Sequence, residues 1–377
     1  MRKGWEYKKL GEVCDITMGQ SPNGNSINEA NGVEFHQGKT CFGERFLGVS
    51  PLYSNAPTKL AEAHSVLLCV RAPVGYPNIT DRKICIGRGL CALYAKGEID
   101  NTFLYYSLLG KQSYFEKNAT GSTFKAISSK IVSNTTLSIP PLSTQLAIVS
   151  ELDKINELIR LKKEQLKDFD NLAQSLFYEM FGDPVENEKG WEVKKLGEIA
   201  KSAIGLTYKP ENVTEELSGT VVLRSSNIQN SILDFNDIVR VNVLVKEDKM
   251  VNDGDILMCS RNGSFRLVGK VALIKGLKER MSYGAFMTII RSPYNPYLFE
   301  YFKTPAFRQY LITGKTTTVN QITVKMLNNL TLPLPPLSLQ RLFAQRIEQI
   351  EREKSEVQKS IQDLETLLAS RMQYWFE

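Results

Sequence analysis

One stretch of the sequence resembles a nucleotide-binding loop. In GVEFHQGKT (32–40), however, five residues separate Gly32 from Gly38, whereas a P-loop has four. A P-loop must direct consecutive backbone N–H groups at phosphates, and one extra residue spoils that geometry. The next segment, CFGERFLGVSP, holds two glycines and a proline and does not favour the helix that a P-loop needs. GRGL (87–90) has only the first two glycines of a dinucleotide-binding fingerprint. The sequence therefore argues against an NTPase.

Metal ligands and activated nucleophiles are scarce as well. The chain has two histidines, His36 and His64, and six cysteines without a CxxC pair. A zinc site needs a cluster of such ligands. We find no acidic cluster typical of a nuclease and no Asn-Pro-Pro-aromatic motif of the kind that amino-methyltransferases use to bind a flipped base. We therefore expect no catalytic residue, no metal and no cofactor of its own in this chain.

Charge and hydropathy point to a cytoplasmic protein with a polyanionic partner. No apolar run approaches the ~18–20 residues of a membrane helix, and the first residues lack the apolar segment of a signal peptide. Six cysteines are compatible with reduced thiols in the cytosol. The net charge of +6 is a weak indication of a polyanionic ligand.

The sequence segments that would position any site occur twice in the chain. GWEYKKLGEV (4–13) returns as GWEVKKLGEI (190–199), and IPPLSTQ (139–145) returns as LPPLSLQ (334–340). AISSKIVSNTTLSIPPLS (126–143) likewise matches QITVKMLNNLTLPLPPLS (321–338). The chain is therefore a tandem duplication of about 190 residues with divergent middles. Similar terminal segments with divergent middles suggest that the two copies share one fold but recognise different targets.

A long amphipathic helix is predicted after each Pro-Pro-Leu-Ser, with Ser143 and Ser338 as N-caps. Apolar residues follow at alternating steps of four and three, which predicts a coiled-coil seam of roughly 50 Å in each copy. Lys162, Lys354 and Arg371 are polar breaks in this pattern. We expect the two helices to pair antiparallel, so that Phe376 lies near Gly4 as Phe181 lies near Gly190. The apolar seam residues are Ile148, Leu152, Ile155, Ile159, Leu166, Phe169, Leu176, Met180, Phe343, Ile347, Ile350, Val357, Ile361, Leu364, Leu368 and Trp375.

Charge is segregated along the chain. Residues 1–142 carry 16 basic and 11 acidic side chains, and residues 188–337 carry 20 and 14. The helical segments 143–187 and 338–377 have net charges of −4 and −1. Two basic regions separated by acidic helices suit contact with DNA phosphates at two places but not between them.

The basic regions read as mixed α and β. Short β-rich runs such as SVLLCV and FMTII alternate with Gly, Asn and Pro breaks. Residues 101–117 and 296–312 are apolar at helical spacing, so each is expected to form a helix on a sheet.

These motifs together resemble one family. The two PPLSxQ-plus-helix blocks, the two GWE-KKLGE openings and GSTFKAIS (121–128) are similar to the specificity subunit of type I restriction-modification systems. HQGKTCFGERF, VRAPVG and CIGRGL also look like one variety of that family's target-recognition domain. The second copy has only a loose version of GSTFKAIS, GKTTTVNQIT (314–323).

The resemblance implies an α+β fold of two mixed α/β target-recognition domains, joined by two long helices in an antiparallel coiled coil. The expected boundaries are 1–142 and 188–337 for the domains, 143–187 for the first spacer helix and linker, and 338–377 for the second helix. It also implies that each domain reads one half of a split double-stranded DNA target. Two methyltransferase subunits and possibly two restriction subunits would be partners. S-adenosylmethionine, ATP and Mg²⁺ would belong to those partners.

Candidate DNA-reading side chains lie in glycine-rich, loop-like stretches. Arg and Lys bond guanine edges or phosphates, and Asn and Gln suit adenine. The first-copy candidates are Gln37, Lys39, Arg45, Arg71, Arg88 and Lys125. The second-copy candidates are Arg224, Asn227, Arg261, Asn262, Arg266 and Lys315.

Two alternative interpretations stay open from the sequence. The chain could be a silent or partner-less specificity copy that serves as a recombination reservoir. It could also be a coiled-coil scaffold protein that reads no DNA sequence, although the segregated charge argues against this.

Overall fold

Two long helices dominate the structure, a computed structural model that describes residues 4–97, 99–121, 125–313 and 320–376. They are α5 (Leu142–Phe181) and α10 (Leu337–Phe376), each of 40 residues, or roughly 60 Å at 1.5 Å per residue. The chain divides into unit 1, residues 1–163 and 358–377, and unit 2, residues 164–357. Each unit thus contains one half of each long helix. We call the parts of units 1 and 2 outside α5 and α10 the first and the second domain.

A buried glutamine sets the start of each long helix. Gln145 Nε2 donates to the carbonyl of Pro140 (2.9 Å), and Gln340 Nε2 donates in the same way to the carbonyl of Pro335 (2.7 Å). These bonds tie the first turn to the extended proline segment before it. The helices begin at residues 142 and 337, so Ser143 and Ser338 lie inside the first turn and their prediction as N-caps is wrong. The carbonyls of the second prolines accept the first helical N–H groups instead.

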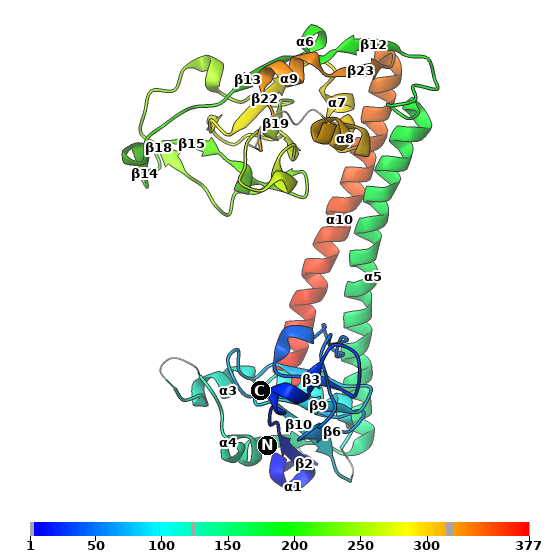
Figure 1. The fold of residues 1–377 in the computed structure, drawn as a ribbon, viewed down its shortest axis with the longest axis vertical. Helices are drawn as coiled ribbons and strands as arrows, with labels where there is room; N and C mark the ends of the chain where they lie inside the picture. Colours follow the sequence, from blue (N-terminus) through cyan, green and yellow to red (C-terminus); the bar gives the residue numbers. More distant parts are fainter. Residues whose placement is uncertain (1–3, 98, 122–124, 314–319, 377) are drawn as a thin grey trace. The chain divides into compact units, whose positions relative to one another are not determined.

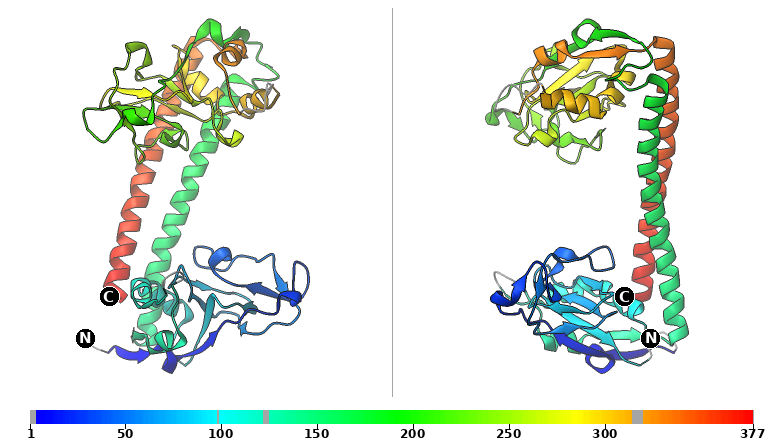
Figure 2. Two further views of the ribbon diagram at one scale, coloured as in Figure 1. Left: turned by 60° about the vertical axis from the view of Figure 1, so that its left-hand side comes forward. Right: turned by 45° about the vertical axis from the view of Figure 1, so that its right-hand side comes forward.

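The helix halves in each unit run antiparallel (Figure 1). In unit 1, Arg371 pairs with Glu151, and Lys163 Nζ lies 3.1 Å from Glu365 Oε1. Residue numbers therefore rise along one helix as they fall along the other. Figure 2 shows the two helices side by side in both of its views. The predicted antiparallel coiled coil is confirmed.

The sixteen apolar seam residues are all buried or half-buried. Two of the three polar breaks pair with acidic residues on the facing helix: Lys354 Nζ lies 2.8 Å from Asp170 Oδ1 in unit 2, and Arg371 pairs with Glu151 in unit 1. Trp375 Nε1 adds a hydrogen bond to Glu151 Oε2 (3.0 Å). Such paired charges at seam positions favour one register over others.

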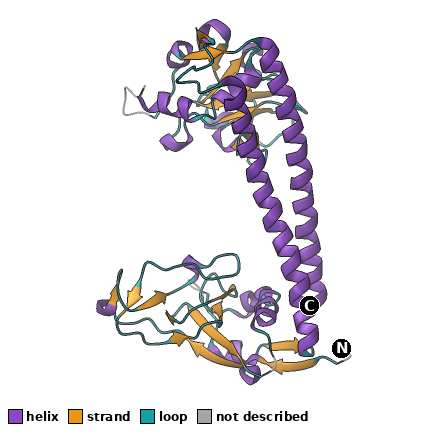
Figure 3. Cartoon of the chain, turned by 90° about the vertical axis from the view of Figure 1, so that its right-hand side faces the viewer, coloured by secondary structure: helices purple, strands orange, loops and turns teal. Residues whose placement is uncertain are grey.

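The first domain is built around a four-stranded antiparallel sheet, drawn in orange in Figure 3. Its central strands are continuous apolar runs and are almost entirely buried, as strands covered on both faces must be. A second sheet packs beside it and contains one parallel pair, β4 with β9. The first sheet has the order β2 (Cys14–Met18), β10 (Leu90–Ala95), β7 (Val66–Cys69), β8 (Pro77–Ile79). The second has the order β3 (Ile27–Asn28), β5 (Tyr53–Ser54), β4 (Val33–His36), β9 (Ile84–Ile86), β6 (Leu60–Ala61).

The second domain repeats this plan with a different periphery. Its four-stranded antiparallel sheet has the same connectivity as the first sheet above, and its second sheet again contains one parallel pair, β15 with β21. The first sheet has the order β13 (Lys201–Ile204), β22 (Met287–Arg291), β19 (Ile256–Cys259), β20 (Val271–Leu273). The others are β14 (Val213–Thr214), β18 (Arg240–Val241), β15 (Thr220–Leu223), β21 (Met281–Tyr283), and the pair β16 (Ile228–Gln229), β17 (Ile232–Leu233).

Each predicted domain helix is in fact two helices. In the first domain the break falls at Gly110, whose α-carbon packs so closely on Phe376 that an added Cβ would lie 2.7 Å from the phenylalanine Cβ. In the second domain Pro305 starts a new helix. The domain helices are α2 (Asn101–Leu109), α3 (Gln112–Asn118), α4 (Ser129–Asn134), α7 (Asn295–Tyr301), α8 (Pro305–Thr313) and α9 (Val324–Asn329).

The repeated opening phrase builds the same small motif twice. A strand pairs with the segment before a long helix, and a four-residue helix follows it. Glu12 Oε2 accepts from the backbone N–H of Lys9 (2.8 Å), and Glu198 Oε2 accepts in the same way from Lys195 (3.3 Å). The elements are β1 (Glu6–Lys9), α1 (Leu10–Val13) and β11 (Thr136–Ile139), then β12 (Glu192–Lys195), α6 (Leu196–Ile199) and β23 (Thr331–Leu334).

The long helices end against these motifs, as the antiparallel arrangement predicts. In unit 1, Trp375 stacks on Trp5 with ring centroids 6.3 Å apart and planes 8° apart. In unit 2, Trp191 Nε1 donates to the carbonyl of Phe181 (2.8 Å). Each opening phrase is therefore anchored to the C-terminal end of a long helix.

Candidate nucleic-acid interface

A loop at the end of β7 positions Arg71 in the first domain. The carbonyl of Val70 accepts from Ile127 N (2.9 Å), and the N–H of Val70 donates to the carbonyl of Gly89 (2.9 Å). Arg71 itself forms an isolated bridge with Ala126. Backbone bonds on both sides fix where this residue stands, while its side chain is exposed.

A half-open pocket of about 140 Å³ lies beside this loop. Four of the six first-copy candidates line it: Gln37, Lys39, Arg71 and Arg88. Lys125 is adjacent, because its carbonyl accepts from the backbone N–H of Ala72, another lining residue (3.0 Å). The structure thus gathers four candidate residues from three separate loops at one pocket, with the backbone of Lys125 next to it.

The side chains of this pocket are donors and not nucleophiles. Lys39 Nζ lies 4.0 Å from the centroid of the Tyr76 ring, a cation–π contact that holds the ammonium at the pocket. Cys69 also lines the pocket, but burial raises the pKa of its thiol to about 12, with Lys39 opposing this weakly. The thiol is therefore protonated at neutral pH and unreactive. The site is suited to binding an anion or the acceptor edge of a base.

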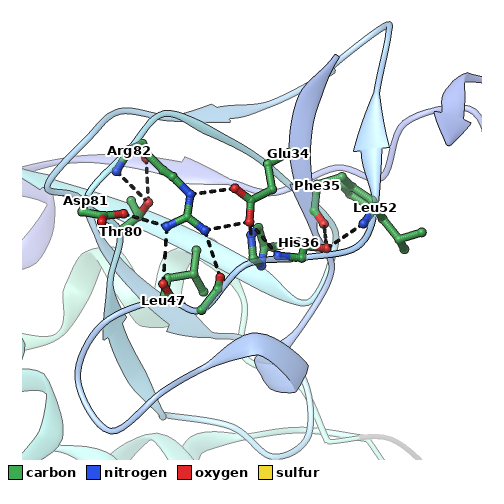
Figure 4. Close-up of polar contacts among 10 residues, drawn as sticks. Glu34, Phe35, His36, Leu47, Leu52, Thr80, Asp81 and Arg82 are labelled. Carbon is green, nitrogen blue, oxygen red and sulfur yellow. Dashed lines mark hydrogen bonds and ion pairs between the residues drawn. The ribbon is translucent and has the colours of Figure 1, made fainter. Parts of the chain in front are cut away.

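A polar network joins β4 to Arg82 (Figure 4). Glu34 accepts two hydrogen bonds from Arg82, Nε to Oε2 (2.6 Å) and Nη2 to Oε1 (2.7 Å), and a third from Ser50 N (2.7 Å). His36 Nε2 lies 2.9 Å from Glu34 Oε1. Burial disfavours the charge on Glu34, but the bonds from Arg82, Ser50 and His36 outweigh it and lower the pKa to about 2. Burial lowers the pKa of His36, and Glu34 opposes this.

This network holds the strand that leads into two of the pocket residues. β4 contains Glu34 and His36 and leads directly into Gln37 and Lys39. Gly87 N donates to the carbonyl of His36 (2.7 Å), which fixes the end of β4 against the neighbouring loop. Glu34, His36 and Arg82 therefore position the pocket, although the sequence analysis did not select them. Their signal was available, since Glu34 and His36 are two residues apart and share a strand face.

Arg45 is the first-copy candidate that the structure places elsewhere. Its Nη1 donates to Asp153 on α5 (2.7 Å), and its Nη2 donates to Thr102 (3.1 Å). The guanidinium also faces the ring of Tyr106 at 5.6 Å. These contacts tie the domain to α5, so Arg45 has a structural role and we leave it out of the DNA-reading set.

In the second domain equivalent backbone contacts position Arg261. Ile322 N donates to the carbonyl of Ser260 (2.7 Å), and Arg261 forms an isolated bridge with Gln321. Ala126 and Gln321 are the matching residues of the two repeats, so Arg71 and Arg261 occupy equivalent places. The Arg261 guanidinium lies 5.2 Å from the centroid of the Phe286 ring.

Other second-copy candidates divide into two groups. Asn262 follows Arg261 and donates to Ser225 Oγ (3.3 Å), and Arg266 is exposed in the same loop. Asn227 is buried, and its amide donates to the carbonyls of Asp234 and Asp237 (both 2.9 Å). It is therefore a loop-folding residue that no base can reach.

Arg224 is half-buried, and its Nη2 donates to Asp237 Oδ1 (2.7 Å), which competes with any DNA contact. Lys315 lies outside the described residues. Within the described ranges, no group of three or more His, Cys, Asp or Glu side chains is arranged to hold a metal ion. Among those same residues, none of the helices is both long and apolar enough to cross a membrane.

Comparison with known proteins decides the family. The profile described as type I restriction modification DNA specificity domain matches residues 2–168 and 188–366, once in each repeat. The chain belongs to this family. The resemblance inferred from the repeated motifs is thereby confirmed.

Relatives of this specificity family match parts of the chain. A protein of Methanocaldococcus jannaschii named as the MjaX type I restriction enzyme specificity subunit is 38% identical over 176 residues, which cover 46% of this chain and 41% of that protein. The EcoKI specificity subunit of Escherichia coli is 27% identical over 167 residues, which cover 42% of this chain and 36% of the relative. The chain thus spans less than half the length of either protein.

Two solved structures share the fold over nearly the full chain. The S subunit of a type I restriction-modification system from M. genitalium has a TM-score of 0.55 at 15% identity and covers 99% of this chain and 96% of its own. A chain from a study of the assembly and conformational transition of the type I system has a TM-score of 0.67 at 21% identity and covers 100% and 98%. The predicted α+β tandem fold is confirmed.

Proposed function

We propose that the chain is the DNA-reading specificity subunit of a type I restriction-modification complex. In this proposal each domain reads one half of a split double-stranded target, and the chain itself carries no catalytic residue. The observation that supports this most directly is the pair Arg71 and Arg261. Two exposed arginines stand on the same backbone frame in domains whose other loops differ. A repeated frame with different surroundings suits two half-sites of different sequence.

The reading set that we propose follows from which candidates lie on this frame. It comprises Gln37, Lys39, Arg71, Arg88 and Lys125 in the first domain, and Arg261, Asn262 and Arg266 in the second. Arginine and lysine donate to guanine edges and to phosphates, and the amide of Gln37 or Asn262 matches adenine. Phosphate contacts generally outnumber base contacts in such interfaces.

We further propose the assembly in which the chain works. Two methyltransferase subunits, and two restriction subunits where these exist, would act at the DNA that the domains select. S-adenosylmethionine, ATP and Mg²⁺ would be bound by those subunits, and the chain would hold no cofactor. The complex would work in the cytoplasm, where the host DNA lies.

The test is modification mapping with single-domain variants. The chain is co-produced with its methyltransferase subunit, and modified DNA motifs are identified by sequencing. Arg71→Ala should relax or abolish the first half-site and leave the second intact, and Arg261→Ala should do the converse. The control variants are Lys83→Ala and Arg280→Ala, because both residues form exposed surface ion pairs. If Arg71→Ala and Arg261→Ala weaken both halves of the motif equally, or if wild type modifies no split motif, the proposal is wrong.

A further inference from the structure

The turn before the central strand differs between the domains, although its backbone is the same. In the first domain the turn is Gly87–Leu90, with Leu90 N donating to the carbonyl of Gly87 (3.0 Å). In the second it is Gly284–Met287, with Met287 N donating to the carbonyl of Gly284 (2.8 Å). Each turn leads into the central strand, β10 or β22.

The third residue of each turn accepts a hydrogen bond from the residue that precedes Arg71 or Arg261. Val70 N donates to the carbonyl of Gly89 (2.9 Å), and Ser260 N donates to the carbonyl of Phe286 (2.9 Å). Gly89 and Phe286 are therefore structural counterparts, one residue from Arg71 and Arg261 across the sheet. Arg88 and Ala285, the second residues of the turns, are counterparts in the same way.

The two turns present different side chains beside the equivalent arginines. A Cβ on Gly89 would lie 2.2 Å from the carbonyl oxygen of Gln37, so the first domain has no room for a side chain there and presents Arg88 instead. The second domain presents Phe286, which is 58% exposed. One domain thus offers a cation, and the other offers an apolar ring at the base of its arginine.

An exposed phenyl ring beside an arginine has a specific use on DNA. Stacking on the ring leaves the edge N–H groups of Arg261 free to donate to a base or phosphate. The ring itself can contact the C5-methyl group of thymine, the one apolar group that a base presents in the major groove. Phe286 keeps more than half of its surface in water, so it is accessible to such a contact.

We propose that Phe286 is a specificity-determining residue that contacts the methyl group of a thymine in the second half-site. In the first domain the counterpart of Phe286 is Gly89, which has no side chain, and the neighbouring Arg88 provides a donor and no apolar contact. This inference rests on the proposed DNA-reading function and assigns one base of the target to one side chain.

The test compares thymine with deoxyuridine, which lacks only the methyl group. Wild-type complex of the chain with its methyltransferase subunit is first used to select a motif from randomised DNA duplexes. Each thymine of the second half-site is then replaced singly by deoxyuridine, and Kd is measured. One replacement should weaken wild-type binding about four-fold, the effect of one buried methyl group. Phe286→Ala should bind the two duplexes equally, and Phe286→Leu should retain part of the preference.

A matched control is available in the first domain. Phe46 is 54% exposed, and the Arg45 guanidinium lies 5.2 Å from its ring centroid, as Arg261 does from Phe286. Arg45, however, is bound to Asp153. Phe46→Ala should therefore leave the thymine preference of the second half-site unchanged.

The outcomes separate the two proposals. If no motif is selected, the DNA-reading function fails and this inference fails with it. If a split motif is selected but no deoxyuridine replacement weakens wild-type binding, the methyl contact is wrong while the function stands. If Phe286→Ala only weakens the base preference of Arg261 and keeps the thymine preference, Phe286 is a positioning residue and the assignment is overturned.

Discussion

Removing the charge of Glu34 should destabilise unit 1 strongly at neutral pH. Its pKa of about 2, against about 4.5 for an ordinary glutamate, corresponds to about 3 kcal/mol of stabilisation at pH 7. Glu34→Gln keeps the shape but loses the bidentate ion pair with Arg82. Since ~1 kcal/mol shifts Tm by about 2–4 °C in a domain of this size, we expect Tm to fall by roughly 6–12 °C.

The pH dependence gives the sign of the effect. The folded state lowers the pKa of Glu34, so its stabilisation is complete above pH 4.5 and is lost as pH falls towards 2. The gap between wild type and Glu34→Gln should therefore be widest near pH 7 and shrink steadily between pH 4.5 and 2.

The assay is thermal unfolding followed by tryptophan fluorescence in a Trp191→Phe background. The remaining tryptophans, Trp5 and Trp375, stack on each other in unit 1 and report on that unit alone. Glu62→Gln is the control, because Glu62 pairs with Lys83 at the exposed surface, where an ion pair contributes at most about 1 kcal/mol. If Glu34→Gln and Glu62→Gln lower Tm by the same amount at pH 7, the network around Glu34 does not stabilise the fold.

Three further outcomes concern the long helices. Lys354→Met should leave Tm unchanged or higher in thermal unfolding, because an apolar seam residue replaces an ion pair, whereas Lys354→Glu should lower it by facing Asp170; equal effects would discount the register argument. Matched one-heptad insertions in both helices should widen the unread gap of the modified motif by about three base pairs, roughly 10 Å, and a motif with an unchanged gap would show that the helices do not set the spacing. Residues 1–187 alone should form a homodimer by light scattering, because each seam can pair with its own copy; a folded monomer would contradict this.

The sequence predicts the architecture of this protein better than it predicts the residues of the candidate DNA interface. The seam, the antiparallel pairing and the tandem domains follow from periodicity and repetition, which local residue types determine. The sorting of candidate arginines does not, because it depends on partners distant in sequence. Arg45 forms an ion pair with Asp153, 108 residues away. Arg71 has no such carboxylate partner among the described residues.

Asn227 shows the same limit at shorter range. Its loop is rich in polar residues and looks exposed, yet the amide is buried between two backbone carbonyls. Phe286 shows the opposite case, because an apolar residue before a strand is expected to be buried, yet it is 58% exposed.

The division of the chain into units has a consequence for its synthesis on the ribosome. Unit 2 is one continuous segment, residues 164–357, whereas unit 1 needs residues 358–377 to complete it. At ~5–20 residues per second, the first half of α5 waits roughly 10–40 s before its partner segment is made. During that time Ile148, Leu152 and Ile155 have no α10 to cover them. The unit that is translated first is therefore completed last, and the nascent chain offers an apolar helix face to chaperones until residues 358–377 emerge.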